Sequence, residues 1–292
     1  MNLNLDMPTF ILIFPALVLA VLLWWLMPDE PGLWDIVPLV ATGVYAAAVY
    51  TFNHQINFWW YKRFPPALPK PMKRVLLDFY PYYGKLNTAE RQRFEQRLGI
   101  IKIDKDFLPQ EFPKMPDDVR HLMLASAVQV TFGLEEYLLP HWGVFAVYRQ
   151  AFHSPQLQEF HTGEVHYEDG VILLAADPFI EGMKNPKSGY DIGLHYLALA
   201  LQFENKIERK DFLFLKNNER EQFLYTMSRI RRRENRYETD YANIPEAEDF
   251  GLCVEHFFHA PHEFEQQLPD TFHALKKLLN QDPTNEANPV VS

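Results

Sequence analysis

The sequence contains a single cysteine, Cys253, among its 292 residues. One thiol cannot form a disulfide within the chain, so a disulfide-stapled fold is excluded, and such sparing use of cysteine fits a reducing compartment. Cys253 lies in an apolar helical pattern, where a buried and inert thiol is more common than a nucleophile.

The chain also lacks an excess of basic residues, because 28 lysines and arginines stand against 38 aspartates and glutamates and give a formal net charge of -10. This balance argues against nonspecific binding of nucleic acid, which requires a basic face that neutralises phosphates. The one basic run, RIRRREN from Arg229, is flanked by glutamates and is typical of a solvated helix face. The motifs G-x-S-x-G and G-x-x-x-x-G-K are absent, so the usual serine-hydrolase elbow and phosphate-binding loop are missing.

Long apolar runs are what the sequence has instead. From Met7 to Pro28 no side chain is charged, and the run FILIFPALVLAVLLWWLM ends in two tryptophans. About 20 such residues span a bilayer. A cleavable signal peptide has a basic start and a small-residue cleavage site, and this N-terminus has neither. We therefore expect an uncleaved membrane helix over residues 8–27.

A second apolar run, Ile36 to Phe52, follows an acidic turn and precedes Trp59 and Trp60, which suit a membrane interface. We expect a second membrane helix over residues 34–53, so that residues 1–62 form an anchor of two helices. Basic residues cluster directly after this run: Lys62, Arg63, Lys70, Lys73 and Arg74. The positive-inside rule then places the rest of the chain in the cytoplasm, on the cell membrane or, in a Gram-negative cell, the inner membrane. If only the first run spans the membrane, the rest of the chain is still predicted to lie in the cytoplasm.

A proline-rich segment over residues 63–75 predicts an extended linker, because proline disfavours helix. We expect a folded domain over residues 76–285 and a flexible tail over 286–292. In TAERQRFEQRLG, Thr88 is the expected cap of a helix and the glycine its stop. Helical spacing also covers Asp117 to Phe132 and residues 191–205, 217–235, 246–260 and 268–280.

Two segments alternate in the manner of strands. Apolar and polar residues alternate on both sides of Glu168, Asp169 and Gly170, which predicts a β-hairpin. The stretch VFAVYRQAF from Val144 predicts a further strand. Helices, a small sheet and more helices in this order indicate a mainly helical α+β domain.

One histidine stands near the start of an apolar helix, GYDIGLHYLALALQFEN, residues 189–205. In zincins the motif H-E-x-x-H places two zinc-binding imidazoles on one helix face, with the glutamate as general base. The corresponding residues here are His195, Tyr196, Leu197, Ala198 and Leu199. Taken alone, such a histidine is more often a hydrogen-bonded core side chain than a ligand.

The segments around this helix are more specific. The chain carries GEVHYEDGVILLAADPFIEGMKNPKSGYDIGLH, then Tyr241-Ala242, Glu248, Phe250, EHFF from Glu255 and APHEF from Ala260. In order and spacing, these elements of residues 85–285 resemble the Mlc titration factor A family of zinc-dependent peptidases. The resemblance implies a mainly helical, zincin-like α+β metallopeptidase domain with a small β-sheet. The apolar runs add an N-terminal transmembrane hairpin.

Carried over residue by residue, the resemblance places His195 at the first zinc ligand and Glu255 at the third. Tyr196 stands at the general base, Leu199 at the second histidine, and Gln202 where the family usually has an aspartate. Tyrosine, with a reference pKa of about 10, is a poor base at neutral pH, and leucine has no lone pair. Since zinc sites normally use three or four protein ligands, we expect no bound cofactor.

A rebuilt zinc site is the alternative. Glu255 and His259 are four residues apart on one predicted helix, so they share a face and would meet His195 as an unusual His-Glu-His set. Against it, His256, His259 and His262 lie near the C-terminal end of that helix, where surface histidines are common.

The sequence therefore predicts a membrane-anchored, cytoplasm-facing, zinc-peptidase-like protein that lacks catalysis and regulates by binding an unknown protein or peptide. The first alternative is an active zinc metallopeptidase with an altered ligand set. The second is a purely structural membrane protein. Under each hypothesis the membrane is a partner and nucleic acid is not.

Overall fold

The computed structural model describes residues 7–28, 30, 32–110, 112–154, 160–184, 191–213, 223–227 and 246–285. The chain divides into two units, Met1–Pro66 and Ala67–Ser292. Several sequence predictions fall outside the described residues, namely the helix over 217–235 except for 223–227, the Tyr241-Ala242 pair and the tail over 286–292.

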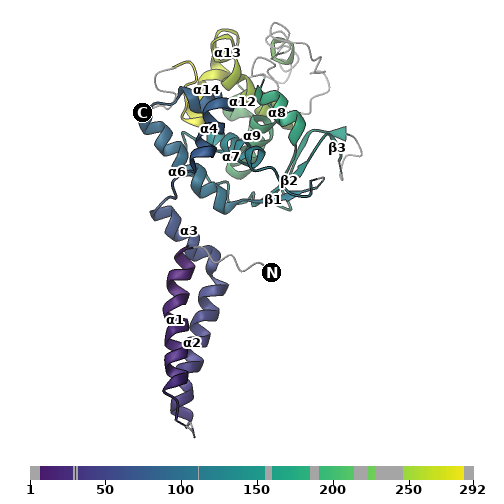
Figure 1. The fold of residues 1–292 in the computed structure, drawn as a ribbon. Coiled ribbons are helices and arrows are strands. Elements are labelled where there is room, and N and C mark those ends of the chain that lie inside the picture. Colours follow the sequence, from purple (N-terminus) through teal and green to yellow (C-terminus); the bar gives the residue numbers. More distant parts are fainter. Residues whose placement is uncertain are drawn as a thin grey trace. The chain divides into compact units, whose positions relative to one another are not determined.

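The first unit is a helical hairpin followed by a shorter helix. Helices α1 (Met7–Trp25) and α2 (Leu33–Thr51) lie side by side and antiparallel, and α3 (Asn53–Arg63) follows α2 (Figure 1). Both long helices are apolar and long enough to cross a membrane, over Pro8–Trp25 and Leu33–Thr51. The predicted pair of N-terminal apolar helices is therefore present.

The coil between the units is shorter than predicted. The division after Pro66 lies inside the expected linker of residues 63–75, but α4 (Lys70–Phe79) also begins inside it. Pro71 occupies the first turn of α4, where a missing N–H costs little because that group has no intrahelical partner. Burial of Met72 and Leu76 then ties the helix to the core.

The second unit contains a four-stranded sheet in the order β1-β2-β6-β5. Strands β1 (Asp106–Pro109), β2 (Val144–Tyr148) and β6 (Val171–Ala175) are parallel, and β5 (Gly163–His166) runs antiparallel to β6 at the edge. The turn from β5 to β6 is the predicted hairpin. Gly170 closes it with a φ of 63°, a conformation that glycine adopts readily. A separate pair joins β3 (Phe152–His153) to β4 (Phe160–His161).

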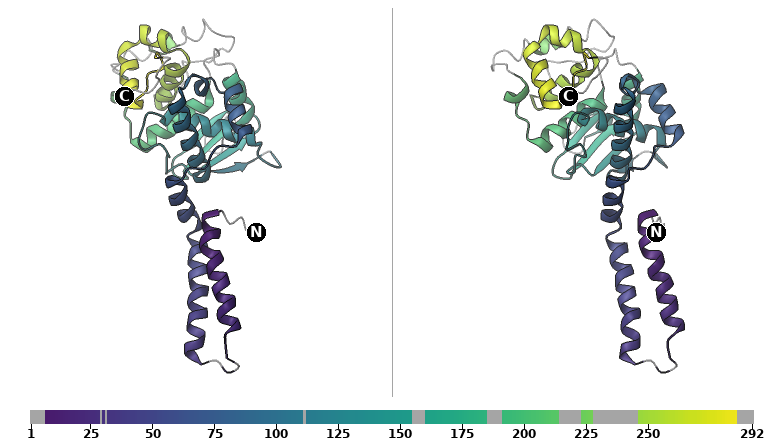
Figure 2. Two further views of the ribbon diagram at one scale, coloured as in Figure 1. Left: turned by 60° about the vertical axis from the view of Figure 1, so that its left-hand side comes forward. Right: turned by 90° about the vertical axis from the view of Figure 1, so that its left-hand side faces the viewer.

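Helices form most of the second unit, so the predicted mainly helical α+β class is confirmed. Five helices match predicted segments: α6 (Thr88–Asp104), α7 (Asp117–Thr131), α9 (Ile192–Asn205), α12 (Asp249–His259) and α14 (Pro269–Leu279). Shorter elements join them: α5 (Pro81–Lys85), α8 (Ala176–Lys184), α10 (Arg209–Phe212), the 3-10 turn η3 (Glu246–Glu248) and α13 (Pro261–Gln267). In two further views the C-terminal helices, in yellow, gather at one end of this unit and the strands lie toward the other (Figure 2).

Helix α6 differs from the prediction at both ends. Its cap is Asn87 rather than Thr88, because the Asn87 side chain accepts from the Glu90 N–H and the Glu90 side chain accepts from the Asn87 N–H, each at 3.0 Å. Gly99 does not end the helix, which continues to Asp104. Burial of Ile100 and Ile101 favours this continuation over a glycine stop.

Helix α9 is central to the second unit. Every residue from Ile192 to Leu201 is buried, and the helix packs against α7, α12 and the strands β5 and β6. A helix that is apolar on all sides is stable only when other elements surround it. The site described next lies at the start of this helix.

Candidate functional site

The N-terminus of α9 positions the residue that stands at the first zinc ligand. Asp191 caps the helix, because its Oδ1 accepts a hydrogen bond from the Leu194 N–H at 3.0 Å. His195 follows one turn later and is 7% exposed. Its imidazole is thus buried away from water, where every polar contact counts for more than in solvent.

Glu255 on α12 bonds directly to this histidine. The Nδ1 atom of His195 lies 2.5 Å from Oε1 of Glu255, whose side chain is 1% exposed. The second carboxylate oxygen, Oε2, accepts the backbone N–H of Asp191 at 3.2 Å. The structure thus brings together the two residues that the resemblance places at the first and third zinc ligands.

A glycine allows the close approach of the two helices. A Cβ atom at Gly251, one turn before Glu255 on α12, would lie 2.9 Å from Nε2 and Cδ2 of His195. Such a contact is too short for a real side chain. Gly251 therefore lets α12 come near enough for the Glu255 carboxylate to reach the ring.

Glu248 contacts the other side of the imidazole. Its Oε2 lies 3.5 Å from Nε2 of His195, an ion-pair distance rather than a close hydrogen bond. Burial alone lowers the pKa of the histidine, but the carboxylates of Glu248 and Glu255 outweigh burial and raise the pKa of His195 to about 9. Without a metal, a pKa of about 9 favours the protonated imidazolium at neutral pH.

This donor set does not fit a zinc ion. The 2.5 Å distance between Nδ1 of His195 and Oε1 of Glu255 is typical of a charge-assisted hydrogen bond and leaves Nε2 as the ring nitrogen that could face a metal. A zinc site normally uses three or four protein ligands, and Leu199 has no donor atom at the position of the second histidine. Among the residues that the structure describes, no group of three or more His, Cys, Asp or Glu side chains is arranged to hold a metal ion.

The remaining positions of the motif are filled by packed side chains. Leu199 is 3% exposed and belongs to the hydrophobic core. Tyr196 is 9% exposed, and its ring lies so close to β5 that a Cβ atom at Gly163 would come within 2.2 Å of it. The tyrosine ring thus fills the space between α9 and the edge strand, at the position where the resemblance expects the general base.

Gln202 has a structural contact at the other end of the motif. Its Nε2 donates to the carbonyl of Ile207 at 3.2 Å. The contact joins the last turns of α9 to the segment that follows the helix. The side chain at the family's aspartate position therefore helps to hold the chain after α9.

His259 does not converge with His195 and Glu255 on a common point. Its Nε2 pairs with Oδ2 of Asp191 at 3.3 Å, and Asp191 in turn contacts Glu255 through its backbone N–H. The residues of the rebuilt site are thus arranged as a chain of hydrogen bonds. Their binding of zinc stays a prediction of the alternative hypothesis.

His256 differs from the expected surface histidine. It is 2% exposed, and its Nδ1 lies 2.9 Å from the carbonyl oxygen of Leu252, one turn earlier in α12. His262 is exposed, as expected. Burial of His256 follows from the packing of α12, which buries every residue from Asp249 to Phe257.

Sequence reasoning gave no site role to Asp191, Glu248 or Gly251. A spacing signal for Glu248 was available, because it precedes Glu255 by seven residues and so lies on the same helix face two turns earlier. Asp191 precedes His195 by four residues and has a residue type that favours N-caps. The contact of Gly251 depends on how two helices pack, which a single sequence does not reveal.

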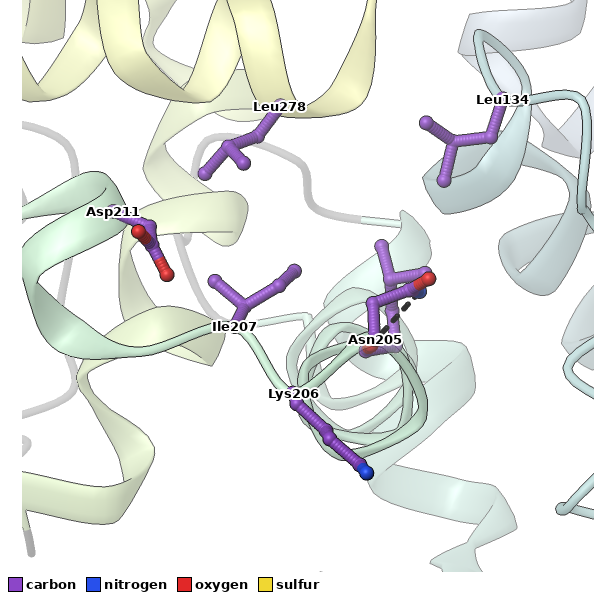
Figure 3. A pocket seen from close by; sticks show the side chains of 7 residues that line it. Leu134, Asn205, Lys206, Ile207, Asp211 and Leu278 are labelled. Carbon is purple, nitrogen blue, oxygen red and sulfur yellow. Dashed lines mark hydrogen bonds between the residues drawn. The ribbon is translucent and has the colours of Figure 1, made fainter.

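A separate pocket of about 280 Å³ lies at the opposite end of α9. Figure 3 shows hydrocarbon from Leu134, Ile207 and Leu278 around it, with Asn205 bonded to a backbone carbonyl. Its full lining is Leu134, Leu201, Asn205, Lys206, Ile207, Asp211 and Leu278. None of these residues belongs to the hydrogen-bonded chain around His195.

Comparisons with known proteins identify the family of the chain. A family model described as glucose-regulated metallo-peptidase M90 matches residues 58–279. A curated protein of Synechocystis sp., described as uncharacterized, is 20% identical over 259 residues, which cover 81% of this chain and 93% of that protein. The family match includes α9 and α12 and confirms the resemblance seen in the sequence. The chain belongs to the M90 family of glucose-regulated metallopeptidases, the family of Mlc titration factor A.

Proposed function

We propose that the chain is a membrane-anchored, cytoplasm-facing relative of the zinc peptidases that has lost catalysis and regulates by binding a protein or peptide. One observation carries the loss of catalysis. Both carboxylate oxygens of Glu255, the expected third zinc ligand, are engaged: Oε1 lies 2.5 Å from Nδ1 of His195, and Oε2 accepts the backbone N–H of Asp191 at 3.2 Å.

The replaced side chains support the same conclusion. Leu199 has no donor atom where the family has its second histidine, and Tyr196 replaces the glutamate that accepts a proton. A positioned general base contributes typically ~10²–10⁴ to the rate of such reactions. The Tyr196 ring instead packs against Gly163. At the motif positions 195–199 the chain thus has neither a second histidine nor the glutamate that would accept a proton.

The edge of the sheet is the place that we propose for binding. Strand β5 pairs with β6 on one side and ends the order of the described four-stranded sheet. Such an edge presents backbone N–H and C=O groups with which an extended peptide can pair. Loss of the catalytic side chains leaves this backbone surface in place. An extended segment of a partner protein is therefore the ligand class that we favour.

The hairpin of α1 and α2 supplies the proposed anchor. Large apolar side chains on it are exposed, among them Val21 at 68% and Trp25 at 78%. An exposed hydrocarbon surface of this kind is suited to lipid rather than water. Lys62 and Arg63 follow the second span, and the positive-inside rule then favours a cytoplasmic second unit.

Peptide hydrolysis by the purified full-length chain tests the proposal when zinc is measured on the same sample. We expect no turnover above the buffer rate, with or without added zinc. Turnover that is abolished by His195→Ala, together with one zinc per chain, would contradict the proposal. The altered ligand set would then be favoured, and Glu255→Ala and His259→Ala should each lose metal and activity together.

A further inference from the structure

We infer that the cleft between α1 and α3 binds one anionic phospholipid. The cleft has a volume of about 380 Å³. Seven residues line it: Pro8, Ile11, Leu12, Gln55, Ile56, Trp59 and Trp60. Six of the seven offer hydrocarbon or an aromatic ring, so the cleft suits an acyl chain. The inference rests on the membrane anchoring proposed above and is independent of the loss of catalysis.

A buried polar contact fixes the two helices beside the cleft. Thr9 on α1 donates from Oγ1 to Oδ1 of Asn57 at 2.9 Å, and Asn57 donates from Nδ2 to Oδ1 of Asn53 at 2.8 Å. Thr9 is 0% exposed and Asn57 is 2% exposed. Since hydrogen bonds in an apolar setting are strong, α3 is held against the first turns of α1 and the cleft is preformed.

The cleft lies at the end of the hairpin where the chain leaves the predicted span. Ile11 and Leu12 are near the start of the apolar window Pro8–Trp25, and α3 begins just after α2 ends at Thr51 (Figure 1). Trp59 is 68% exposed and Trp60 is 36% exposed. Tryptophan is enriched at the boundary between acyl chains and headgroups. A lipid in the cleft would therefore place its headgroup beside the last turn of α3.

Charge at that turn selects an anionic headgroup. Lys62 and Arg63 are three and four residues after Trp59, so they lie on the side of α3 that lines the cleft. Both side chains are exposed. In the described part of this unit, Glu30 precedes α2 and Asp35 lies in its first turn, whereas α3 follows the opposite end of α2. Two basic residues near a lipid headgroup are expected to favour an anionic over a zwitterionic lipid by roughly tenfold or more.

Native mass spectrometry of the detergent-solubilised full-length chain tests this inference. The chain is titrated with dioleoyl phosphatidylglycerol or with dioleoyl phosphatidylcholine. We expect one phosphatidylglycerol per chain, bound roughly tenfold more tightly than phosphatidylcholine. The double variant K62Q/R63Q should lose this preference. The matched variant K70Q/R74Q, which removes two exposed basic residues of α4, should keep it.

A second pair of variants tests the cleft itself. Ile11→Trp fills the cleft and should weaken binding of both lipids. Val21→Trp places the same side chain at an exposed position of α1 outside the cleft lining and should have no effect. Glycerol phosphate added as a competitor should not displace the lipid, because it has no acyl chain to fill the cleft.

Several results would overturn the inference. These are equal binding of the two lipids, an equal loss of preference in both basic-pair variants, or unchanged binding in Ile11→Trp. Displacement of the lipid by glycerol phosphate would show that Lys62 and Arg63 bind free phosphate esters rather than a lipid headgroup. If the chain forms a dimer without bound lipid and Ile11→Trp disrupts it, the cleft binds a second copy of the chain instead. Extraction of the chain from membranes by sodium carbonate would refute the anchoring itself, so the two failures are distinguishable.

Discussion

The imidazole of His195 and the carboxylate of Glu255 form a 2.5 Å hydrogen bond between two buried helices, α9 and α12. The ring carries a positive charge at neutral pH and lies between the carboxylates of Glu248 and Glu255. An imidazolium thus supplies the positive charge that a metal ion would bring to such carboxylates.

Glu255→Gln should destabilise the second unit. The substitution keeps the size of the side chain but leaves a buried imidazolium with a weaker partner, and breaking a buried charge pair costs about 3 kcal/mol. Urea denaturation of the full-length chain in detergent, followed by circular dichroism, measures the loss. Glu135→Gln changes an exposed glutamate and serves as the control. A loss that is the same in both variants would show that the buried contact contributes nothing.

Stability should depend on pH through His195. Its pKa is raised to about 9 from the usual 6.5, so the folded chain holds the proton more tightly than the unfolded chain. This contribution is fully present below pH 6.5 and is lost as the pH rises through about 9. The thermal midpoints of the wild type and His195→Gln should differ most near pH 6 and converge toward pH 10. A difference that is constant across this range would contradict the assigned charge.

Gly163→Ala should destabilise the contact between β5 and α9. The added Cβ atom would lie 2.2 Å from the ring of Tyr196, and overpacking of this kind typically costs ~1–3 kcal/mol. Gly143→Ala is the matched control, because a Cβ atom there has nothing within 4 Å.

A double-mutant cycle identifies the cause of the Gly163→Ala effect. When Tyr196 is replaced by alanine, the added methyl group no longer meets a ring, so Gly163→Ala should then cost little. An equal cost in both backgrounds would assign the effect to the strand rather than to the tyrosine.

Part of this arrangement follows from sequence patterns and part does not. The apolar runs predict α1 and α2, and the alternation around Glu168-Asp169-Gly170 predicts the β5–β6 hairpin, because both signals are local. Strand β1 was not predicted. It is only Asp106–Pro109, and pairing with β2 rather than any internal pattern defines it.

The site shows the same division. The family resemblance places His195 and Glu255 at two ligands of one zinc ion, so it predicts that the two residues are neighbours in space. It did not predict that the two side chains bond to each other, or that His259 pairs with Asp191. Those contacts depend on the packing distance between α9 and α12, which Gly251 sets.

Restoring the motif tests how far the site around His195 has changed. Leu199→His and Tyr196→Glu together recreate H-E-x-x-H at residues 195–199. Each places a polar group in an apolar site, at an expected cost of ~1–3 kcal/mol. Denaturation measures this cost, and a double variant as stable as the wild type would contradict the packing described here. Zinc retained by the double variant would show that these two side chains are sufficient to restore binding, and its absence would show that the site around His195 has changed elsewhere.

Removal of residues 7–51 should release the chain from membranes. These residues contain both candidate spans, and the second unit buries its own core. Fractionation and immunoblotting measure the distribution of the full and truncated chains. In right-side-out spheroplasts, an external protease should leave the second unit of the full chain intact. Cleavage of that unit without lysis would contradict the cytoplasmic orientation.

The most direct test of the central claim is the zinc content of the purified full-length chain. Elemental mass spectrometry after dialysis against buffered zinc gives the number of ions per chain. Because both carboxylate oxygens of Glu255 are engaged and Leu199 has no donor atom at the position of the second histidine, we predict far less than one zinc per chain, with no change in His195→Ala or Glu255→Ala. One zinc per chain that either substitution removes would contradict the account.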